Sequence, residues 1–335
     1  MSHTAVVILN YNGENLLKQF LPSVIQHSEN AEVIVADNGS TDESIRVLEA
    51  QFPAVRVIKL GHNYGFCGGY NRALKQVQAD YYVLLNSDIE VTPKWLTPMV
   101  DLLDKNNDMA TVQPKILSYS KRNYFEYAGA AGGLIDSFGY PFCRGRIFDH
   151  AEEDDNQYND IRPVFWSTGA CMMIRAEMYH RFNGLDEDFF AHMEEIDLCW
   201  KIHRAGQKVM YCGHSTVYHL GAGTLNYLNP RKTYLNFRNG LFLVYRHFSS
   251  LDLLVKFPVR IGLDWLAGLV FLLKGQHEHA KAVLDAHADF LKHLNRERQK
   301  RRALHRDFPR YDDNMIYKGS IVFDFFILKK RQSKG

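Results

Sequence analysis

Apolar and polar positions in the first hundred residues alternate between two periods. Four short runs rich in β-branched and aromatic residues, each closed by a polar turn, predict strands over residues 4–9, 32–36, 55–60 and 81–85. Between the first two runs, apolar residues recur at helical spacing from Leu16 to Ile25. Strands that alternate with helices pair in parallel, so the pattern predicts an α/β domain built on a doubly wound, mostly parallel sheet.

Local signals place further helices. Ser40 followed by Glu43 matches a capping box and predicts a helix through Leu48. A glycine-rich loop leads into a helical pattern over residues 70–77, and Pro93 suits the first turn of the helix after the fourth strand. Right-handed crossovers bring the ends of parallel strands to one edge, so we expect a shared edge for the residues that close them: Asn10, Asp37, Gly61 and Asn86.

The second half of the chain is less regular. Residues 118–163 carry glycine, tyrosine and acidic clusters and predict a long variable loop near the site. Residues 164–175 predict a strand broken at 167–169, and from Tyr234 onward the spacing is helical. We therefore expect an α/β domain over residues 1–225 and a helical extension over residues 226–335.

Composition narrows the range of functions. The formal net charge of +2 provides no overall field for nucleic acid, and five cysteines without CxxC spacing suit a reducing compartment. The longest apolar run, residues 266–273, is far shorter than the ~20 residues that span a bilayer. The chain begins with a strand rather than a leader. We expect a cytoplasmic protein, with attachment to the inner face of the cell membrane as an open alternative.

Two features suit the binding of a nucleotide. Asp37 follows an apolar strand, where its carboxylate can accept the N3–H of a uracil or thymine ring or can close an Asx-turn before Gly39. The glycine-rich loop over residues 61–71 precedes a helix, so its backbone can approach a phosphate. A purely structural glycine turn is the alternative for this loop.

Asp88 is the candidate metal ligand. It closes the turn Asn86-Ser87-Asp88 after the fourth strand, and Mg²⁺ or Mn²⁺ takes such oxygen ligands while bridging phosphates. His219 ends another β-like run and is either a nitrogen ligand or a structural histidine.

Glu194, Glu195 and Asp197 open a predicted helix that stops at Gly206. Acids are stabilising in any first helical turn, which is a sufficient structural reason for them. The apolar lead-in over residues 189–193 would bury them, however, and burial and crowding of like charges raise the pKa of a carboxylate. A raised pKa suits a general base.

These motifs together resemble glycosyltransferase family 2, with its GT-A fold, and within it the bacterial rhamnosyltransferase-like members. The resemblance covers roughly residues 4–225. It rests on an ordered set: VVILNYN at 6–12, VIVADNGSTD at 33–42, NYGFCGGYN at 63–71, LLNSD at 84–88, GLDEDFF at 184–190, EEIDLCWK at 194–201, and His219.

The resemblance implies a role for each motif. Asp37 would contact the pyrimidine, Asp88 would hold the divalent metal together with His219, and Glu195 would be the catalytic base. Glu194 and Asp197 would orient the acceptor or support the helix. The donor side would be completed by Asn10, Asn12, Asn38, Gly65, Gly68, Asn71, Asn86 and Ser87. The chain departs from the family in two places, since the metal motif keeps only its last acid and Glu195 stands where an Asp is frequent.

The implied reaction is an inverting sugar transfer from a nucleotide diphosphate donor, dTDP-rhamnose or a UDP-sugar. The acceptor would be a glycan or lipid-linked hydroxyl in cell-envelope polysaccharide synthesis. A non-catalytic nucleotide-sugar-binding partner of another transferase is the alternative. A nicotinamide-dependent oxidoreductase is disfavoured, because residues 10–13 are no glycine fingerprint.

The extension leaves three roles open. Its leucine-rich segment, residues 251–266, predicts a helix broken or kinked near Pro258, and a basic run follows at residues 296–306. These segments could lie on an anionic membrane, pack against the α/β domain, or join a second subunit in a homodimer.

Overall fold

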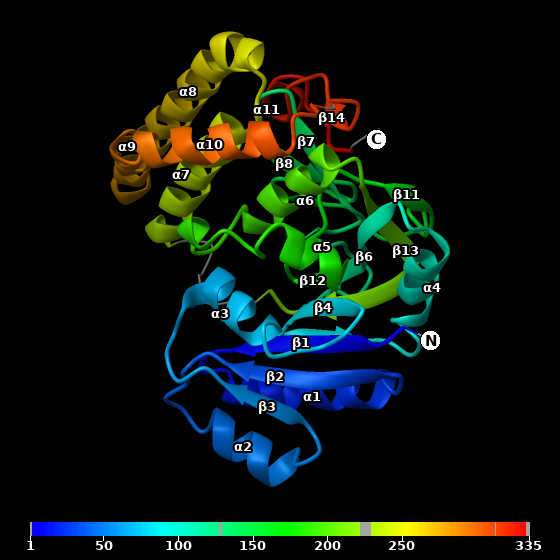
Figure 1. Cartoon of the computed structure of the whole chain (residues 1–335). Coiled ribbons are helices and arrows are strands. Elements are labelled where there is room, and N and C mark those ends of the chain that lie inside the picture. Colours follow the sequence, from blue (N-terminus) through cyan, green and yellow to red (C-terminus); the bar gives the residue numbers. More distant parts are fainter. Residues whose placement is uncertain (1, 127–128, 222–228, 312, 333–335) are drawn as a thin grey trace.

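The computed structural model describes residues 2–126, 129–221, 229–311 and 313–332. A nine-stranded sheet forms the middle of the molecule, with the last helices stacked at one end (Figure 1). The expected domain boundary at residue 225 lies outside the described residues. In spatial order the sheet contains β11 (Ile161–Pro163), β13 (Lys208–His219), β6 (Met109–Ser118), β12 (Cys171–Arg175), β4 (Tyr81–Asn86), β1 (Thr4–Asn10), β2 (Ala31–Asp37) and β3 (Arg56–Lys59), while β5 (Ile89–Val91) pairs with β13.

Strand direction determines which residues meet. The strands β4, β1, β2 and β3 are parallel, and β12 runs antiparallel to both β4 and β6. Since β4 and β6 are both antiparallel to β12, they run in the same direction. The strand β13 is parallel to β6 and therefore also runs in the direction of β4 and β1. Asn10, Asp37 and Asn86 therefore lie at the carboxyl ends of strands on one edge, as predicted, and Gly61 follows the end of β3 there. His219, at the end of β13, lies on the same edge.

Helices cover both faces of the sheet. Val6 and Ile8 of β1 pack with the apolar residues of α1 (Glu14–His27), α2 (Ser44–Gln51) and α4 (Thr97–Lys105), whereas Val7 packs on the opposite face. The opposite face is covered by α3 (Gly65–Leu74), α5 (Ala176–Arg181), a 3₁₀ turn (Glu187–Phe189) and α6 (Glu194–Arg204). This double coverage explains why the central strands are continuously apolar.

The four strands of the first half, the helix α1, the break before β12, the helix α6 and the strand ending at His219 are confirmed. The capping box is wrong: α2 begins at Ser44, and the Ser40 hydroxyl instead accepts from Asn10 Nδ2 at 3.1 Å. The placement of Pro93 is also wrong. Lys94 adopts a positive φ of 61°, which interrupts a helix, and α4 begins at Thr97 with Pro98 in its first turn.

The expected long loop over residues 118–163 is also wrong. Four short strands of this segment form a second sheet with one strand from the end of the chain, in the order β10 (His150–Ala151), β9 (Arg146–Ile147), β8 (Pro141–Cys143), β7 (Gly133–Asp136) and β14 (Ile316–Tyr317). Since β14 comes from the end of the chain, the extension is joined to the α/β domain through this sheet.

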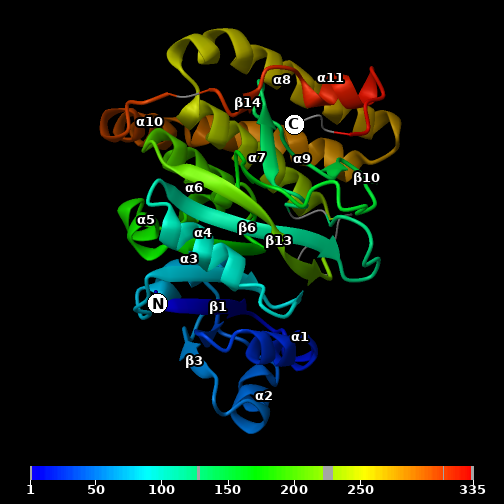
Figure 2. The ribbon, with the colours of Figure 1, turned by 90° about the vertical axis from the view of Figure 1, so that its right-hand side faces the viewer.

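The extension is helical, as predicted. It contains α7 (Pro230–His247), α8 (Ser250–Leu273), α9 (His277–Lys292), α10 (Leu294–Asp307) and α11 (Ile321–Phe326). The helix α8 continues through Pro258 without a break. Figure 2 shows these helices as a layer above the sheet. None of the described helices is long and apolar enough to cross a membrane.

Candidate functional site

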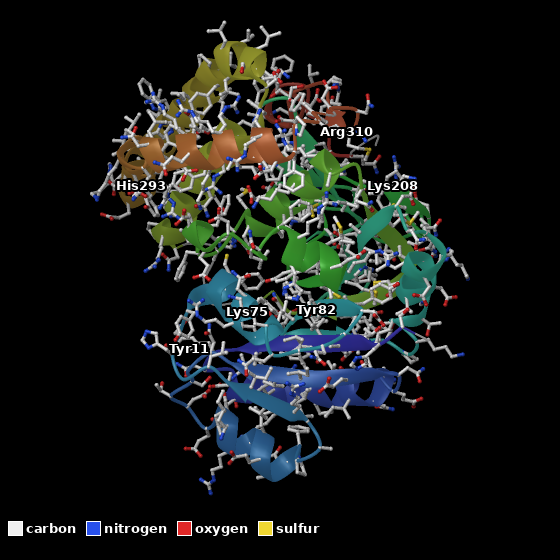
Figure 3. All side chains as sticks on the ribbon, viewed as in Figure 1. Tyr11, Lys75, Tyr82, Lys208, His293 and Arg310 are labelled. Atoms are coloured by element: carbon white, nitrogen blue, oxygen red, sulfur yellow. The ribbon has the colours of Figure 1, made fainter. Side chains whose placement is uncertain are left out.

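The carboxyl edge of β1 and β2 is closed by a buried polar turn. The carboxylate of Asp37 accepts from the backbone N–H groups of Gly39 and Ser40, at 3.2 and 3.0 Å, and from Asn10 Nδ2 at 3.2 Å. The Asx-turn anticipated for Asp37 is therefore present. Tyr11, labelled in Figure 3, follows this edge directly and is partly exposed.

Two asparagines expected on the donor side hold loops in place. Asn38 donates to Gly65 O at 3.0 Å and accepts from Tyr64 N at 3.0 Å, which fixes the glycine-rich loop beside β2. Asn71 bonds both backbone groups of Leu185, at 2.8 and 2.9 Å. Because these amides are occupied by backbone groups, they fix the loops that they contact.

The other residues expected on the donor side lie just after β1, in the glycine-rich segment 61–71 and at the end of β4. Asn12, with a positive φ of 51°, accepts from Thr41 N at 2.7 Å. A side chain at Gly65 would lie 3.1 Å from the ring of Phe190, and one at Gly68 would lie 2.8 Å from Arg72 Nη1. Asn86 and Ser87 are half-buried at the end of β4.

Asp88 and His219 lie in direct contact. Asp88 Oδ1 is 3.1 Å from His219 Nε2, and the other ring nitrogen, Nδ1, is 2.9 Å from Glu126 Oε2. Burial alone would lower the pKa of His219, but the hydrogen bonds and charges of Asp88 and Glu126 outweigh it and raise the pKa to about 10. The two carboxylates thus favour a positive charge at this point.

This pair fits a divalent cation as a partial set of ligands. Across the described residues no group of three or more His, Cys, Asp or Glu side chains is arranged to hold a metal ion by itself. Asp88 would supply one oxygen, and His219 would supply one nitrogen once a cation replaces its proton, while the rest of the shell would come from donor phosphate and water, as is usual for Mg²⁺ sites. Glu126 stands where a carboxylate orients a metal-binding imidazole.

The loop that leads into α6 is strained and clamped. Phe190, His192 and Met193 adopt positive φ values of 64°, 70° and 74°. The side-chain amide of Asn239 in α7 donates to three carbonyl oxygens of this loop, those of Phe189, Ala191 and His192, at 3.0, 2.9 and 2.7 Å. Strain of this kind persists only where the surroundings enforce it.

The carboxyl groups of the first two residues of α6, Glu194 and Glu195, have raised pKa values. Burial, reinforced by the charge of Glu195, raises the pKa of Glu194 well above its usual range. Burial also raises the pKa of Glu195 to about 7. One oxygen of each group, Oε2, is buried without a hydrogen-bond partner among the described residues.

Glu195 lies at the same edge as Asp88. Asn86 N donates to Ala170 O at 2.9 Å, so the residues just before β12 sit at the end of β4. A side chain at neighbouring Gly169 would lie 3.8 Å from Cβ of Glu195 and 3.3 Å from the ring of Phe66 in α3. The absence of that side chain leaves space between α6 and α3.

The pKa of Asp197 is shifted in the opposite direction from those of Glu194 and Glu195. It is fully buried and contacts Lys201 Nζ at 2.5 Å and His247 Nε2 at 2.9 Å, with Arg246 at 3.8 Å. Burial would raise its pKa, but these partners lower the pKa far below its usual range. Asp197 therefore stays ionised and anchors α6 to α7, which corresponds to the structural role considered for it.

The C-terminal helices hold the segment before α6 through buried charges. Arg246 of α7 bonds Asp186 at 2.9 Å and Glu297 of α10 at 2.5 Å. Lys300 of α10 also reaches Asp186, at 2.6 Å. Packing of the extension against the α/β domain is thus confirmed, and part of the basic run serves this contact.

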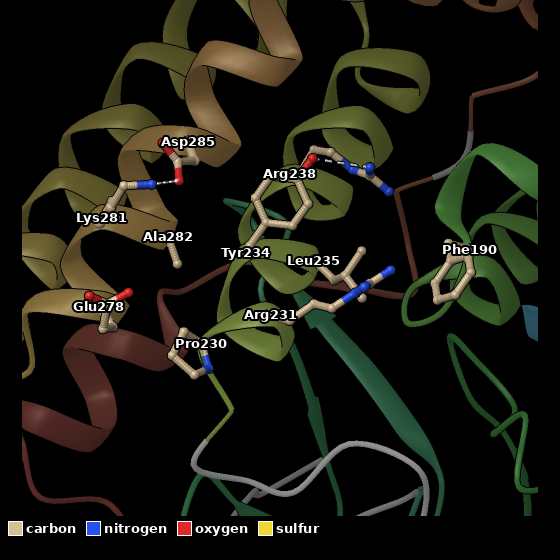
Figure 4. Close-up of a pocket in the computed structure, with 10 residues that line it drawn as sticks. All are labelled: Phe190, Pro230, Arg231, Tyr234, Leu235, Arg238, Glu278, Lys281, Ala282 and Asp285. Carbon is tan, nitrogen blue, oxygen red and sulfur yellow. Dashed lines mark hydrogen bonds and ion pairs between the residues drawn. The ribbon is translucent and has the colours of Figure 1, made fainter.

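A pocket of about 530 Å³ adjoins the strained loop (Figure 4). It lies between α7 and α9 and is lined by Phe190, Pro230, Arg231, Tyr234, Leu235, Arg238, Glu278, Lys281, Ala282 and Asp285. Lys281 is paired with Asp285 at 2.7 Å, and Arg231 stacks over Phe190 with its guanidinium carbon 5.2 Å from the ring centroid. Phe190 also lies against the glycine-rich loop, since a side chain at Gly65 would be 3.1 Å from its ring.

The sequence model described as glycosyl transferase family 2 matches residues 5–181, which is more than half of the chain. The chain belongs to this family. An N-acetylglucosaminyl-diphospho-decaprenol L-rhamnosyltransferase of Mycobacterium tuberculosis is 26% identical over 230 residues, covering 64% of this chain and 75% of that protein. Rhamnosyltransferase WbbL of Escherichia coli K12 is 23% identical, covering 62% and 79%.

Solved structures support the GT-A fold. A mannosyltransferase of Pyrobaculum calidifontis with GDP-mannose and Mn²⁺ superposes with a TM-score of 0.53 at 13% identity, covering 87% of both chains. Residues 1–349 of TarS from S. aureus give 0.56 at 16% identity, covering 90% of this chain and 86% of that one. GalNAc-T7 with UDP, GalNAc and Mn²⁺ gives 0.57 at 15%, covering 75% and 49%. This family 2 protein is a glycosyltransferase.

Proposed function

We propose that this glycosyltransferase inverts the anomeric centre of a sugar as it moves it from a nucleotide diphosphate to a hydroxyl group, with Glu195 as the general base. The observation that supports this most is the state of Glu195. Its carboxylate is buried at the edge shared with Asp88, has a pKa raised to about 7, and keeps one oxygen without a hydrogen-bond partner among the described residues.

In this reaction the acceptor oxygen attacks the anomeric carbon while Glu195 takes the hydroxyl proton. The new C–O bond forms as the bond from the anomeric carbon to the phosphate oxygen breaks, and its electron pair leaves with the nucleoside diphosphate. A carboxylate with a pKa near the working pH is suited to this role. Positive charge develops on the sugar ring, as in glycoside hydrolysis.

The donor side rests on the carboxyl edge of the sheet. Asp37 and the glycine-rich loop held by Asn38 would enclose the pyrimidine and the phosphates of a dTDP- or UDP-linked sugar. A Mg²⁺ or Mn²⁺ ion held by Asp88 and His219 would neutralise the charge on the leaving diphosphate. Mn²⁺ in the named structures of two relatives in fold favours manganese.

The acceptor is proposed to reach Glu195 from the side of the α7–α9 pocket. Arg231 and Arg238 could accompany the phosphates of a lipid-linked acceptor, while Tyr234 and Phe190 offer ring faces to a sugar. The similarity to a transferase named for a diphospho-decaprenol acceptor favours this class in cell-envelope polysaccharide synthesis, at the inner face of the cell membrane.

The test is a pair of isosteric substitutions, Glu195→Gln and Glu194→Gln. Glu195→Gln should lower kcat by about 10²–10⁴-fold while binding of dTDP or UDP with Mn²⁺ is unchanged, because only proton transfer is lost. Glu194→Gln should retain far more activity, since a group held protonated is already neutral. Equal losses in both variants, or full turnover in Glu195→Gln, would refute the assignment of the base.

A further inference from the structure

The helix α8 presents its apolar side outward. All four of its charged residues, Asp252, Lys256, Arg260 and Asp264, follow at four-residue spacing and form one face. That face is directed into the protein, since Arg260 and Asp264 are 3% and 0% exposed. The helix therefore directs its charged side chains into the protein and its apolar side chains to the surface, which reverses the usual arrangement of a surface helix.

The outward face, called here the α8 stripe, is continuous. Its exposed apolar side chains are Leu251, Leu254, Val255, Val259, Trp265, Leu266, Leu269, Val270, Leu272 and Leu273. Leu254 and Leu273 are 75% and 79% exposed. At 1.5 Å per residue the stripe runs for about 33 Å, and none of its members is charged. A contiguous apolar surface of this length marks an interaction site.

The outward orientation is enforced by specific bonds. Arg260 donates to the carbonyl oxygens of Phe138 and Gly139, both at 3.2 Å, and to Asp264 at 2.9 Å. Tyr140 OH donates to Asp264 at 2.7 Å. Turning the stripe inward would remove this buried ion pair from its partners and bury it against hydrocarbon, at high cost.

A second apolar element with basic neighbours lies at the same end of the molecule as α8 (Figures 1 and 2). The turn between β7 and β8, which holds Arg260, also holds the start of α11, because Asp136 accepts from Ile321 N at 2.9 Å. Both helices lie at the same end of the molecule in Figures 1 and 2. The exposed apolar residues of this element are Phe323, Phe326, Ile327 and Leu328, followed by exposed Lys329, Lys330 and Arg331.

We propose that the α8 stripe and α11 together form a docking surface for an anionic lipid bilayer, with the apolar side chains in the acyl boundary and residues 329–331 at the headgroups. Apolar residues beside cations are the arrangement of interfacial membrane helices. A second copy of the chain fits less well, because an isologous contact brings the same basic segment of both copies to one interface. Arg296 and Lys300 of the basic run at 296–306 bind Asp188 and Asp186, so this run is left out of the surface. Lys330 likewise pairs with Asp324 at 2.7 Å, so the headgroup contact rests chiefly on Lys329 and Arg331.

The test is co-sedimentation of the full chain with vesicles of phosphatidylcholine containing phosphatidylglycerol, at low salt. Leu254→Ser/Leu266→Ser should lower the partition coefficient about tenfold or more, since each leucine withdrawn from hydrocarbon loses a large transfer free energy. Ile25→Ser/Ile161→Ser, which alters exposed residues of α1 and β11, is the matched control and should bind as the unaltered chain.

Lys329→Glu/Arg331→Glu provides a second, independent variant. It should lose the preference for anionic over pure phosphatidylcholine vesicles while leaving the stripe intact. The proposal is overturned if the unaltered chain does not bind anionic vesicles, if the stripe variant binds equally well, or if the stripe instead mediates a dimer that dissociates in Leu254→Ser/Leu266→Ser. Vesicle binding needs no turnover, so the outcome is separate from that for Glu195.

Discussion

The carboxyl edge of β1 and β2 and the first turn of α6 both gather polar side chains, but these groups are used in different ways. At the strand edge, Asp37 and Asn38 are saturated by backbone groups of the loops they hold. At α6, Glu194 and Glu195 each keep a buried oxygen without a hydrogen-bond partner in the described part of the chain. Asp37 and Asn38 are thus held by the loops around them, whereas Glu194 and Glu195 retain unpaired hydrogen-bonding capacity among the described residues.

The same contrast occurs within α6 itself. Glu195 and Asp197 are two residues apart, yet burial raises the pKa of one while Lys201, His247 and Arg246 lower the pKa of the other. Lys201 of α6 itself, together with Arg246 and His247 of α7, accounts for this difference. The acidic motif thus contains raised carboxyl groups and one ionised anchor, Asp197.

The largest effect is expected from removing the anchor's partner. Arg246→Ala would leave the carboxylates of Asp186, Asp197 and Glu297 buried without their shared cation. Breaking a buried ion pair in this way costs about 3–5 kcal/mol. Urea unfolding should show this loss, whereas Arg46→Ala, which breaks an exposed pair with Glu43, should leave the midpoint nearly unchanged. Equal midpoints for both variants would mean that the buried ion pairs of Arg246 contribute nothing to the free energy of unfolding.

The metal pair gives the next largest effect. Ligand at one hundred times its dissociation constant stabilises a native protein by about 2.7 kcal/mol. Thermal stability should therefore rise with UDP or dTDP plus Mn²⁺, but not with GDP or NAD, and the Mn²⁺-dependent part should vanish in Asp88→Ala. A response that persists in Asp88→Ala would place the metal elsewhere.

A smaller effect is expected from Glu126, which touches the metal pair only through His219. Glu126→Ala should weaken Mn²⁺ affinity by about 10–100-fold, the usual range for a carboxylate that orients a metal-binding imidazole. Calorimetric titration in the presence of nucleotide would measure it. Glu90→Ala is the matched control. Glu90, in β5, lies opposite Tyr218 of β13, next to His219, but forms its ion pair with Arg122. Unchanged affinity in Glu126→Ala would remove Glu126 from the site.

The sequence predicted the strand edge well because each signal there is local. An apolar run closed by a polar turn identifies β1, β2 and β4, and strand direction alone brings Asn10, Asp37 and Asn86 together. The motif at Glu194 and the ending of β13 at His219 are local in the same sense. Their family resemblance supplied roles that spacing could not.

The missed features depend on contacts between distant segments. The second sheet has strands of two to four residues, and its edge strand β14 comes from the end of the chain, so no periodic pattern reveals it. Asn239 and Arg246 lie inside α7, where a polar residue at a buried position is the only signal. Ser40 does not cap α2, because its hydroxyl oxygen accepts hydrogen bonds from Asn10 Nδ2 and Asn12 N, about thirty residues away in the sequence.

The pH dependence of kcat/KM, measured with saturating Mn²⁺, tests the role of Glu195 most directly. A general base acts when deprotonated. A pKa raised to about 7 therefore predicts that log(kcat/KM) rises with a slope of one below pH 7 and is level above it. In Glu195→Gln this limb should disappear from the residual activity. A limb at the pKa of an ordinary glutamate, near 4.3, or one that persists in Glu195→Gln, would contradict the account.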